Sequence, residues 1–429
     1  GISWKRTFKN KLGYFIASLS NNRLENNFKR FKNNIEELDP VYLNISVEDE
    51  TKLRFISTYS LNNYKLSYGA NLQSSSYSNN TLFRYYNIDY DTKVDFLKYG
   101  VFLKSSKNFL KDKLGVSFGI RLDQDTFTKE SSILENTSPR LALSYILSKD
   151  NRWKLNFTVG RYFKIPTYTS LGFKNFYNQY VNKSSKYTRS DHLVSGIEFN
   201  STQSSRFTFE AFYKTYDNYP VSVIDGVSLA NKGAGFEVLG NEAIFTNGRG
   251  KAYGLEFLYQ QKLSNNFYGI FSYTFFYSKF SGLDNKFLPS VWDNRHLLSF
   301  TGGYKLKKNW ELSAKFRYNY KTPYAPVDLS SSAKAYPEII FDYSQLGNYY
   351  LNDFGKLDIR IDKRWNYKTT SLNFYIDIEN ILISNIPVPP EYGLERDDNG
   401  EVINPLNLTE VVSESSSSLI PSIGIVFDF

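Results

Sequence analysis

Residues 114–123 read Leu-Gly-Val-Ser-Phe-Gly-Ile-Arg-Leu-Asp, and every second residue of this stretch is apolar. A β-strand sends successive side chains to opposite faces. The apolar face carries Leu114, Val116, Phe118, Ile120 and Leu122, and the other face carries Gly115, Ser117, Gly119, Arg121 and Asp123. One face therefore suits hydrocarbon and the other suits water, which is typical of a transmembrane β-barrel.

The same alternation recurs along the chain, and it predicts seventeen strands with no helical segments between them. Their expected positions are 1–8, 12–22, 50–60, 63–75, 94–106, 112–126, 138–148, 152–164, 187–199, 205–217, 250–263, 266–280, 292–306, 309–322, 354–366, 369–383 and 419–429. A soluble sandwich would bury its apolar faces in a core about 10 Å thick. A long sequential series fits an all-β, antiparallel up-and-down barrel better.

The connections between these strands fall into two classes. Short ones are expected at 9–11, 62–63, 107–111, 149–152, 202–204, 264–265, 307–308 and 367–368, and long ones at 76–93, 165–186, 218–249, 323–353 and 384–418. Outer-membrane barrels have this asymmetry, with tight periplasmic turns and long external loops. Trp153, Trp310 and Trp365 lie near short turns on the apolar face, where they would form part of an aromatic girdle.

Composition agrees with a barrel and excludes several other classes of protein. The chain has 429 residues and 17% aromatic residues, and no run of about 18 apolar residues that could form a transmembrane helix. Cysteine is absent and the two histidines, His192 and His296, are isolated, so neither a thiolate nor a histidine metal site is expected, and no cofactor. The net charge of +9 is spread along the chain, which favours contact with anionic lipid headgroups over nucleic acid.

The odd strand number carries a prediction about the chain's start. Bacterial single-chain barrels have even strand counts, with both termini on the periplasmic side. If the strand ending at Phe429 descends to the periplasm, the segment at Gly1 must also descend. We therefore expect an N-terminal portion with an odd number of strands to precede this sequence.

Several motifs resemble recurrent strands of TonB-dependent outer-membrane receptors. They are Ser138-Pro-Arg-Leu-Ala-Leu-Ser-Tyr145, Gly250-Lys-Ala-Tyr-Gly-Leu-Glu256, Phe271-Ser-Tyr-Thr-Phe275, Trp292-Asp-Asn-Arg-His296 and Pro421-Ser-Ile-Gly-Ile425. The alternating last strand, which closes on Phe429, is similar to the signal read by the outer-membrane barrel assembly machinery. These motifs spread over essentially the whole chain.

The resemblance implies a barrel of about 22 strands filled by an N-terminal plug domain. Residues 1–429 would then be the C-terminal part of the barrel. The plug and the TonB-binding segment would lie upstream, as would the small carboxypeptidase-regulatory-like β-domain that the most similar branch of the family often carries. Implied partners are outer-membrane lipid, the chain's own plug, TonB, and a surface lipoprotein or larger outer-membrane complex.

Candidate binding residues lie in two places. The loops at 165–186 and 323–353 are rich in aromatic residues, which stack on ligands or pack on one another. From them we select Tyr168, Phe173, Phe176, Tyr177, Tyr324 and Tyr343. The polar strand faces contribute Arg317, Arg360 and Asp362, although such charges commonly pair with each other inside a barrel.

Residues 396–401 (Arg-Asp-Asp-Asn-Gly-Glu) have carboxylates suited to calcium, but Asn-Gly favours a simple hairpin tip. No catalytic motif is present, so an enzyme is not expected. The resemblance implies an outer-membrane receptor that binds a nutrient at its external loops and imports it through a plugged barrel. The alternative is a passive pore or a barrel component of a secretion or assembly complex.

Overall fold

The computed structural model describes residues 1–9, 12–33, 37–84, 88–129, 132–175, 177–233, 238–336, 338–395, 402–404, 407–411 and 417–429. The first strands are β1 (Ile2–Thr7), β2 (Gly13–Asn33), β3 (Leu38–Leu61), β4 (Tyr64–Phe83), β5 (Ile88–Phe109), β6 (Leu114–Asp125), β7 (Thr137–Ile146), β8 (Trp153–Lys164), β9 (Thr188–Asn200) and β10 (Ser205–Ser222). They are followed by β11 (Ile244–Ser264), β12 (Phe267–Ser281), β13 (Phe287–Pro289), β14 (His296–Leu306), β15 (Trp310–Asn319), β16 (Phe354–Asn366), β17 (Ser371–Glu379), β18 (Glu391–Leu394), β19 (Leu408–Val411) and β20 (Ile420–Asp428).

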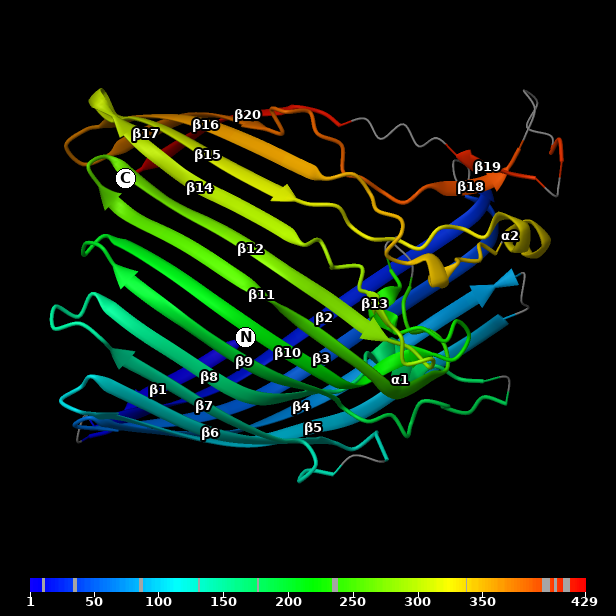
Figure 1. Cartoon of the computed structure of the whole chain (residues 1–429), viewed down its shortest axis with the longest axis horizontal. Helices are drawn as coiled ribbons and strands as arrows, with labels where there is room; N and C mark the ends of the chain where they lie inside the picture. The colour runs from blue at the N-terminus through cyan, green and yellow to red at the C-terminus, as the bar shows by residue number, and fades with distance from the viewer. Residues whose placement is uncertain are drawn as a thin grey trace.

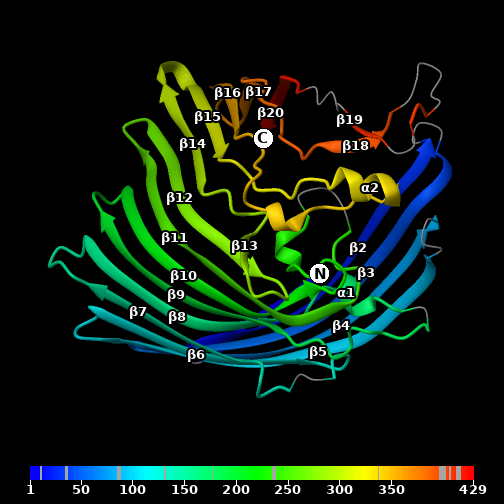
Figure 2. The ribbon, with the colours of Figure 1, turned by 45° about the vertical axis from the view of Figure 1, so that its right-hand side comes forward.

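The strands form one 18-stranded antiparallel sheet, with β18 and β19 as a separate two-stranded hairpin. The strands of the large sheet pair in chain order, except that β12 pairs with both the short β13 and β14, and β20 pairs with β17. The sheet curls around a concave interior, as Figures 1 and 2 show. We call this concave face the inner wall. Such an up-and-down order is the barrel architecture that the sequence predicts.

All seventeen predicted strands are present, and the three-residue β13 is the additional strand of the sheet. The prediction of a long loop at 76–93 is wrong, because β4 continues to Phe83 and β5 begins at Ile88. Likewise, β10 and β11 shorten the expected loop at 218–249. Beyond the apolar band the outer faces of β4 and β5 become polar, and the buried apolar residues Tyr77, Val94 and Phe96 lie on the inner face instead, so the pattern of apolar residues pointing outward is lost.

The prediction that no helices lie between the strands is also wrong. Two short helices occur in the long loops, α1 (Tyr168–Gly172) and α2 (Leu329–Ala335), together with the 3₁₀ turns η2 (Leu229–Asn231), η3 (Lys307–Asn309) and η4 (Tyr343–Gln345). Thr167 caps α1 and Asp328 caps α2 by accepting a backbone hydrogen bond. Among the described residues, no helix is long and apolar enough to cross a membrane.

An apolar band covers the convex face of the sheet. On β5 it comprises Leu97, Tyr99, Val101 and Leu103, which are 39–48% exposed. Near the short turns, Trp153, Trp310 and Trp365 are 40–42% exposed, where the sequence places them. Exposed apolar side chains in such a continuous belt are expected where a barrel meets hydrocarbon rather than water.

Strands β2 to β5 are among the longest of the sheet, together with the 21-residue β11. They have 20–24 residues, whereas β14 to β17 have 9–13. A membrane strand needs only about 9–11 residues. Because the apolar band on β5 ends at Leu97 and is followed by Asp95 and Lys93, the remaining residues project past it on the long-loop side. Hydrogen bonds from Asn44 to Asn79 (3.0 Å) and Thr81 (2.8 Å) join β3 and β4 in this projection.

Candidate functional site

The long loops are anchored on the inner wall of the projecting strands. Helix α1 packs there, in a cluster formed by Tyr77, Val94, Phe96, Phe127, Tyr168 and Leu171. Tyr168 is only 7% exposed, and its hydroxyl donates to Glu50 (2.5 Å) and also contacts Lys98 and Ser75. Burial raises the pKa of Tyr168, and the hydrogen bond to Glu50 adds to this rise. Tyr168 therefore stays a neutral donor that fixes α1 to the wall.

Buried asparagines join one loop to the next. Asn182 is 2% exposed, and its amide nitrogen donates to the backbone oxygens of Ser170 (2.7 Å) and Glu242 (2.8 Å). Its amide oxygen accepts from the backbone nitrogen of Ile244 (3.0 Å). A single side chain thus satisfies three backbone groups, from its own loop, from the loop at 223–243 and from the start of β11, which joins the two loops.

The loop at 223–243 is held in the same manner to the segment around β13. Asn231 donates to the backbone oxygens of Leu288 (3.2 Å) and Pro289 (2.8 Å). Lys232 bridges Asp225 (2.5 Å) and Glu242 (2.8 Å). Burial alone would lower the pKa of Lys232, but attraction by the two carboxylates outweighs burial and the pKa is raised. The lysine therefore remains charged and the ion pairs persist at neutral pH.

The loop at 320–353 completes this layer. Leu288, Ala325 and Leu346 form a small core, and Val227, Phe341 and Tyr343 pack against it. Tyr324 lies edge-on to Tyr349, with ring centroids 6.1 Å apart. We call the joined segments 165–187, 223–243, 282–295 and 320–353 the loop layer. Figure 2 shows α1, β13 and α2 on the concave side of the sheet.

A few large side chains of the loop layer remain uncovered. Tyr177 is 83% exposed, Trp292 is 53% exposed and Tyr349 is 46% exposed. With Tyr350, which is 38% exposed, these are aromatic side chains of the described part of the layer that could stack on a ligand. They are the loop positions best suited to recognition.

On the inner wall, β15, β16 and β17 carry a dense set of paired charges. Arg360 donates two hydrogen bonds to Asp362, at 2.9 and 2.8 Å, and stacks on Tyr375 at 3.8 Å. Lys356 pairs with Asp358 (3.5 Å) and Glu379 (3.0 Å). Arg317 faces the same space but is exposed, and among the described residues it has no ion-pair partner. Most of this surface therefore neutralises itself.

The structure divides the residues selected from the sequence into separate groups. Tyr168 is a buried anchor, Phe173 packs against Tyr90 with ring centroids 6.3 Å apart, and Tyr177 is 83% exposed. Tyr324 and Tyr343 are half-buried in the second loop. Arg317, Arg360 and Asp362 lie together on the inner wall, on other strands than those that hold α1.

Two expectations fall outside the described residues, namely Phe176 and the calcium or hairpin reading of residues 396–401. Within the described ranges, no group of three or more His, Asp or Glu side chains is arranged to hold a metal ion. No resident metal is therefore assigned to this part of the chain.

Sequence reasoning missed the residues that organise the loop layer. Asn182 and Asn231 have no distinguishing pattern around them, because their partners are backbone groups far along the chain. Trp292 did have a signal, since it begins the motif Trp-Asp-Asn-Arg-His. It was assigned to a strand, but β14 starts only at His296, which leaves Trp292 in a loop.

Comparison with known proteins agrees with the barrel fold. A sequence profile of the family described as TonB dependent receptor-like, beta-barrel matches residues 1–381. No curated protein matches the chain. Among solved structures, the chain is similar to the pyoverdine outer membrane receptor FpvA from Pseudomonas aeruginosa PAO1 bound to pyoverdine, with 12% identity and a TM-score of 0.62 over 100% of this chain and 60% of that one.

Two further structures give the same result. The copper transporter OprC has 14% identity and a TM-score of 0.61, over 99% of this chain and 63% of that one. The ferric yersiniabactin uptake receptor FyuA from Yersinia pestis has 10% identity and a TM-score of 0.60, over 99% of this chain and 60% of that one. The chain thus spans 60–63% of the length of these three proteins, and at such identities the likeness concerns the fold.

Proposed function

Because the chain belongs to the family of TonB-dependent receptor-like β-barrels, we propose that it forms the barrel of an outer-membrane receptor that takes up a nutrient. The family is found in the outer membrane of Gram-negative bacteria, and its members are receptors and transporters rather than enzymes. In the proposed cycle, the loop layer binds the ligand outside the cell. The ligand then passes along the inner wall towards the short turns.

The loop layer is the observation that carries this proposal. Its segments are tied together by Asn182 and Asn231, yet it presents Tyr177, Trp292 and Tyr349 to solvent. Rigidly held aromatic side chains bind at a low entropic cost, because little motion remains to be lost. A simple pore would have no need for such a surface.

The ligand class proposed first is a metal chelate. The titles of the solved relatives name pyoverdine, ferric yersiniabactin and copper. Planar or ring-bearing chelates would stack on the exposed aromatic side chains. The full receptor would also need a plug, coupling to TonB through a segment outside residues 1–429, and outer-membrane lipid around the apolar band. A surface lipoprotein is a further proposed partner.

The test uses the full-length receptor in its own outer membrane. Tyr177→Ala and Trp292→Ala should each lower the affinity for the imported ligand about tenfold, as expected for aromatic anchors in an interface. The ligand is identified beforehand by native mass spectrometry of the purified receptor. Tyr367→Ala and Trp365→Ala, at the short-turn end, are the matched controls and should leave the affinity unchanged.

Conductance measurements in planar bilayers test the alternative function, a passive pore. A plugged receptor should show no large open channel, whereas a passive pore would conduct constantly. A constitutive large conductance of the full-length protein, together with unchanged ligand affinity in both loop variants, would overturn the proposal.

A further inference from the structure

Four basic side chains and two glycines form one row across the inner wall, on six neighbouring strands. Strand pairing places the following residues opposite one another in succession, from β5 to β10: Lys104, Gly119, Arg140, Gly160, His192 and Lys214. Residues opposite one another in an antiparallel sheet point to the same face. We call these six residues the cationic row.

The glycines in the row make room for the long side chains beside them. A Cβ atom on Gly160 would lie 3.2 Å from Arg140 Cγ and 3.2 Å from the Tyr162 ring. The stem of Arg140 therefore lies over Gly160, and its guanidinium stacks on Tyr162 at 4.2 Å. This packing holds the Arg140 head group in place without using its hydrogen-bond donors.

The cations of the row lack carboxylate partners in the part of the chain that the structure describes. Among the described residues, no carboxylate forms an ion pair with Lys104, Arg140 or Lys214, although Arg140 and Lys214 contact the aromatic rings of Tyr162 and Phe212. One nearby ion pair joins Arg121 to Asp123, whose carboxylate accepts two hydrogen bonds of 2.6 Å, and another joins Arg161 to Asp191 at 2.7 Å. The row is therefore a local excess of positive charge.

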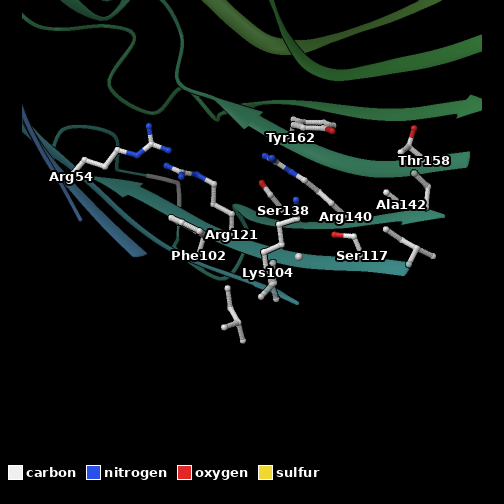
Figure 3. Close-up of a pocket in the computed structure, with 15 residues that line it drawn as sticks. Arg54, Phe102, Lys104, Ser117, Arg121, Ser138, Arg140, Ala142, Thr158 and Tyr162 are labelled. Atoms are coloured by element: carbon white, nitrogen blue, oxygen red, sulfur yellow. The ribbon is translucent and has the colours of Figure 1, made fainter. Parts of the chain in front are cut away.

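Three residues of the row, Lys104, Gly119 and Arg140, line a hollow on the inner wall. It has a volume of about 380 Å³, and Arg54, Lys104, Arg121 and Arg140 contribute to its lining along with Ser117, Ser138 and Tyr162. Figure 3 shows the basic side chains on the same side of the sheet, above β5 to β8. Arg54, like the cations of the row, has no ion pair among the described residues. The hollow could hold a phosphate or a carboxylate with ample donors around it.

We propose that the cationic row and its hollow bind oxyanion groups, that is, phosphates or carboxylates, inside the barrel. Guanidinium and ammonium groups bind such oxygens through charge-assisted hydrogen bonds. Low-dielectric walls of one charge sign also raise the local concentration of anions. Where the ligand is imported cargo, the inference rests on the proposed uptake function; where it is a protein carboxylate, it does not.

The two sources of the anion can be separated with one set of variants. The test variant of the full-length receptor combines Lys104→Gln, Arg140→Gln and Lys214→Gln. The matched control combines Lys111→Gln, Lys149→Gln and Lys368→Gln, which removes the same charge from exposed turns. Binding of radiolabelled inorganic phosphate and thermal unfolding are measured on the purified protein.

If the row binds free anions, the wild type and the control bind phosphate, and the test variant binds it at least about tenfold more weakly. If carboxylates of a protein segment inside the barrel occupy the row, phosphate does not bind. The test variant then unfolds at a lower temperature than the control, and about 1 M salt narrows the difference.

The inference is overturned if the test variant matches the control in both measurements. Neither readout requires import of a nutrient. A receptor that fails to transport would therefore still report on the row, and failure of the proposed function remains distinguishable from failure of this inference.

Discussion

Two parts of the inner wall carry many charges and use them differently. On β15 to β17, the cations Lys356 and Arg360 each have carboxylate partners within 4 Å. On β5 to β10, the cations of the row face glycines and aromatic rings instead. On the first surface these cations are paired with carboxylates, whereas on the second the basic side chains keep hydrogen-bond donors that no carboxylate accepts. Charge density therefore does not identify a binding surface, but the absence of partners does.

The largest expected effect separates the two surfaces by stability. Arg360→Met leaves Asp362 without its main partner, so the free energy of unfolding should fall by about 2 kcal/mol. Arg140→Met should change it by less than about 0.5 kcal/mol in phosphate-free buffer. Urea unfolding in lipid vesicles, followed by tryptophan fluorescence, measures both. Equal losses would mean that Arg140 also has a carboxylate partner, and the comparison would fail.

A designed partner for the row should have the next largest effect. Ala142 lines the same hollow as Arg140, so Ala142→Glu places a carboxylate beside unpaired cations. We expect a gain of about 1 kcal/mol in unfolding free energy at low salt, and little gain at about 1 M salt. Ala142→Gln is the matched control and should show no salt-dependent gain. A gain that survives high salt would point to packing rather than charge.

Arg140 and Arg360 each stack on a tyrosine ring, and removing these rings should have a smaller effect. Tyr162→Leu removes the ring under Arg140, and Tyr375→Leu removes the ring under Arg360. Because Arg360 is still fixed by Asp362, only the first change should free a guanidinium. We expect phosphate affinity to fall about threefold in Tyr162→Leu and to stay constant in Tyr375→Leu, from the usual size of a cation–π contact. An equal decrease in both variants would argue against a localised site.

The smallest effect concerns the glycines of the row. Gly119→Ala places its Cβ no closer than 3.6 Å to any neighbour, so it should stabilise the strand by about 0.5 kcal/mol. In Gly160→Ala the new Cβ atom would lie 3.2 Å from Arg140 and Tyr162, so this variant should not show the same rise in stability. Urea unfolding of the two variants side by side gives the difference. If both are stabilised alike, Gly160 does not serve to seat Arg140.

The strand series shows how far periodicity alone can reach. The strand at 354–366 was predicted with the bounds of β16, because each of its apolar residues alternates with a charged one. The same rule failed for β4 and β5 beyond the membrane band. There Ser74, Ser76 and Ser78 give the projecting part of β4 a polar outer side, so no alternation signals the strand. Neighbouring strands, rather than the local sequence, keep this region extended.

The binding residues were harder to predict than the strands. An aromatic loop residue looks the same in the sequence whether it is buried, as Tyr168 is, or exposed, as Tyr177 is. Arg360 and Arg140 are likewise both inward-facing arginines. Their difference depends on the residues of neighbouring strands, which are fixed only by the register of the sheet.

The sequence by itself determined the up-and-down series of strands, their two faces and the end that carries the long loops. These features depend on the period of two that hydrocarbon and water impose on each strand separately. Only the tertiary structure decided which loops join into one layer and which cations remain without partners. Both depend on contacts between residues far apart in the chain, such as Asn182 with Glu242 and Arg140 with Gly160, and no local pattern encodes them.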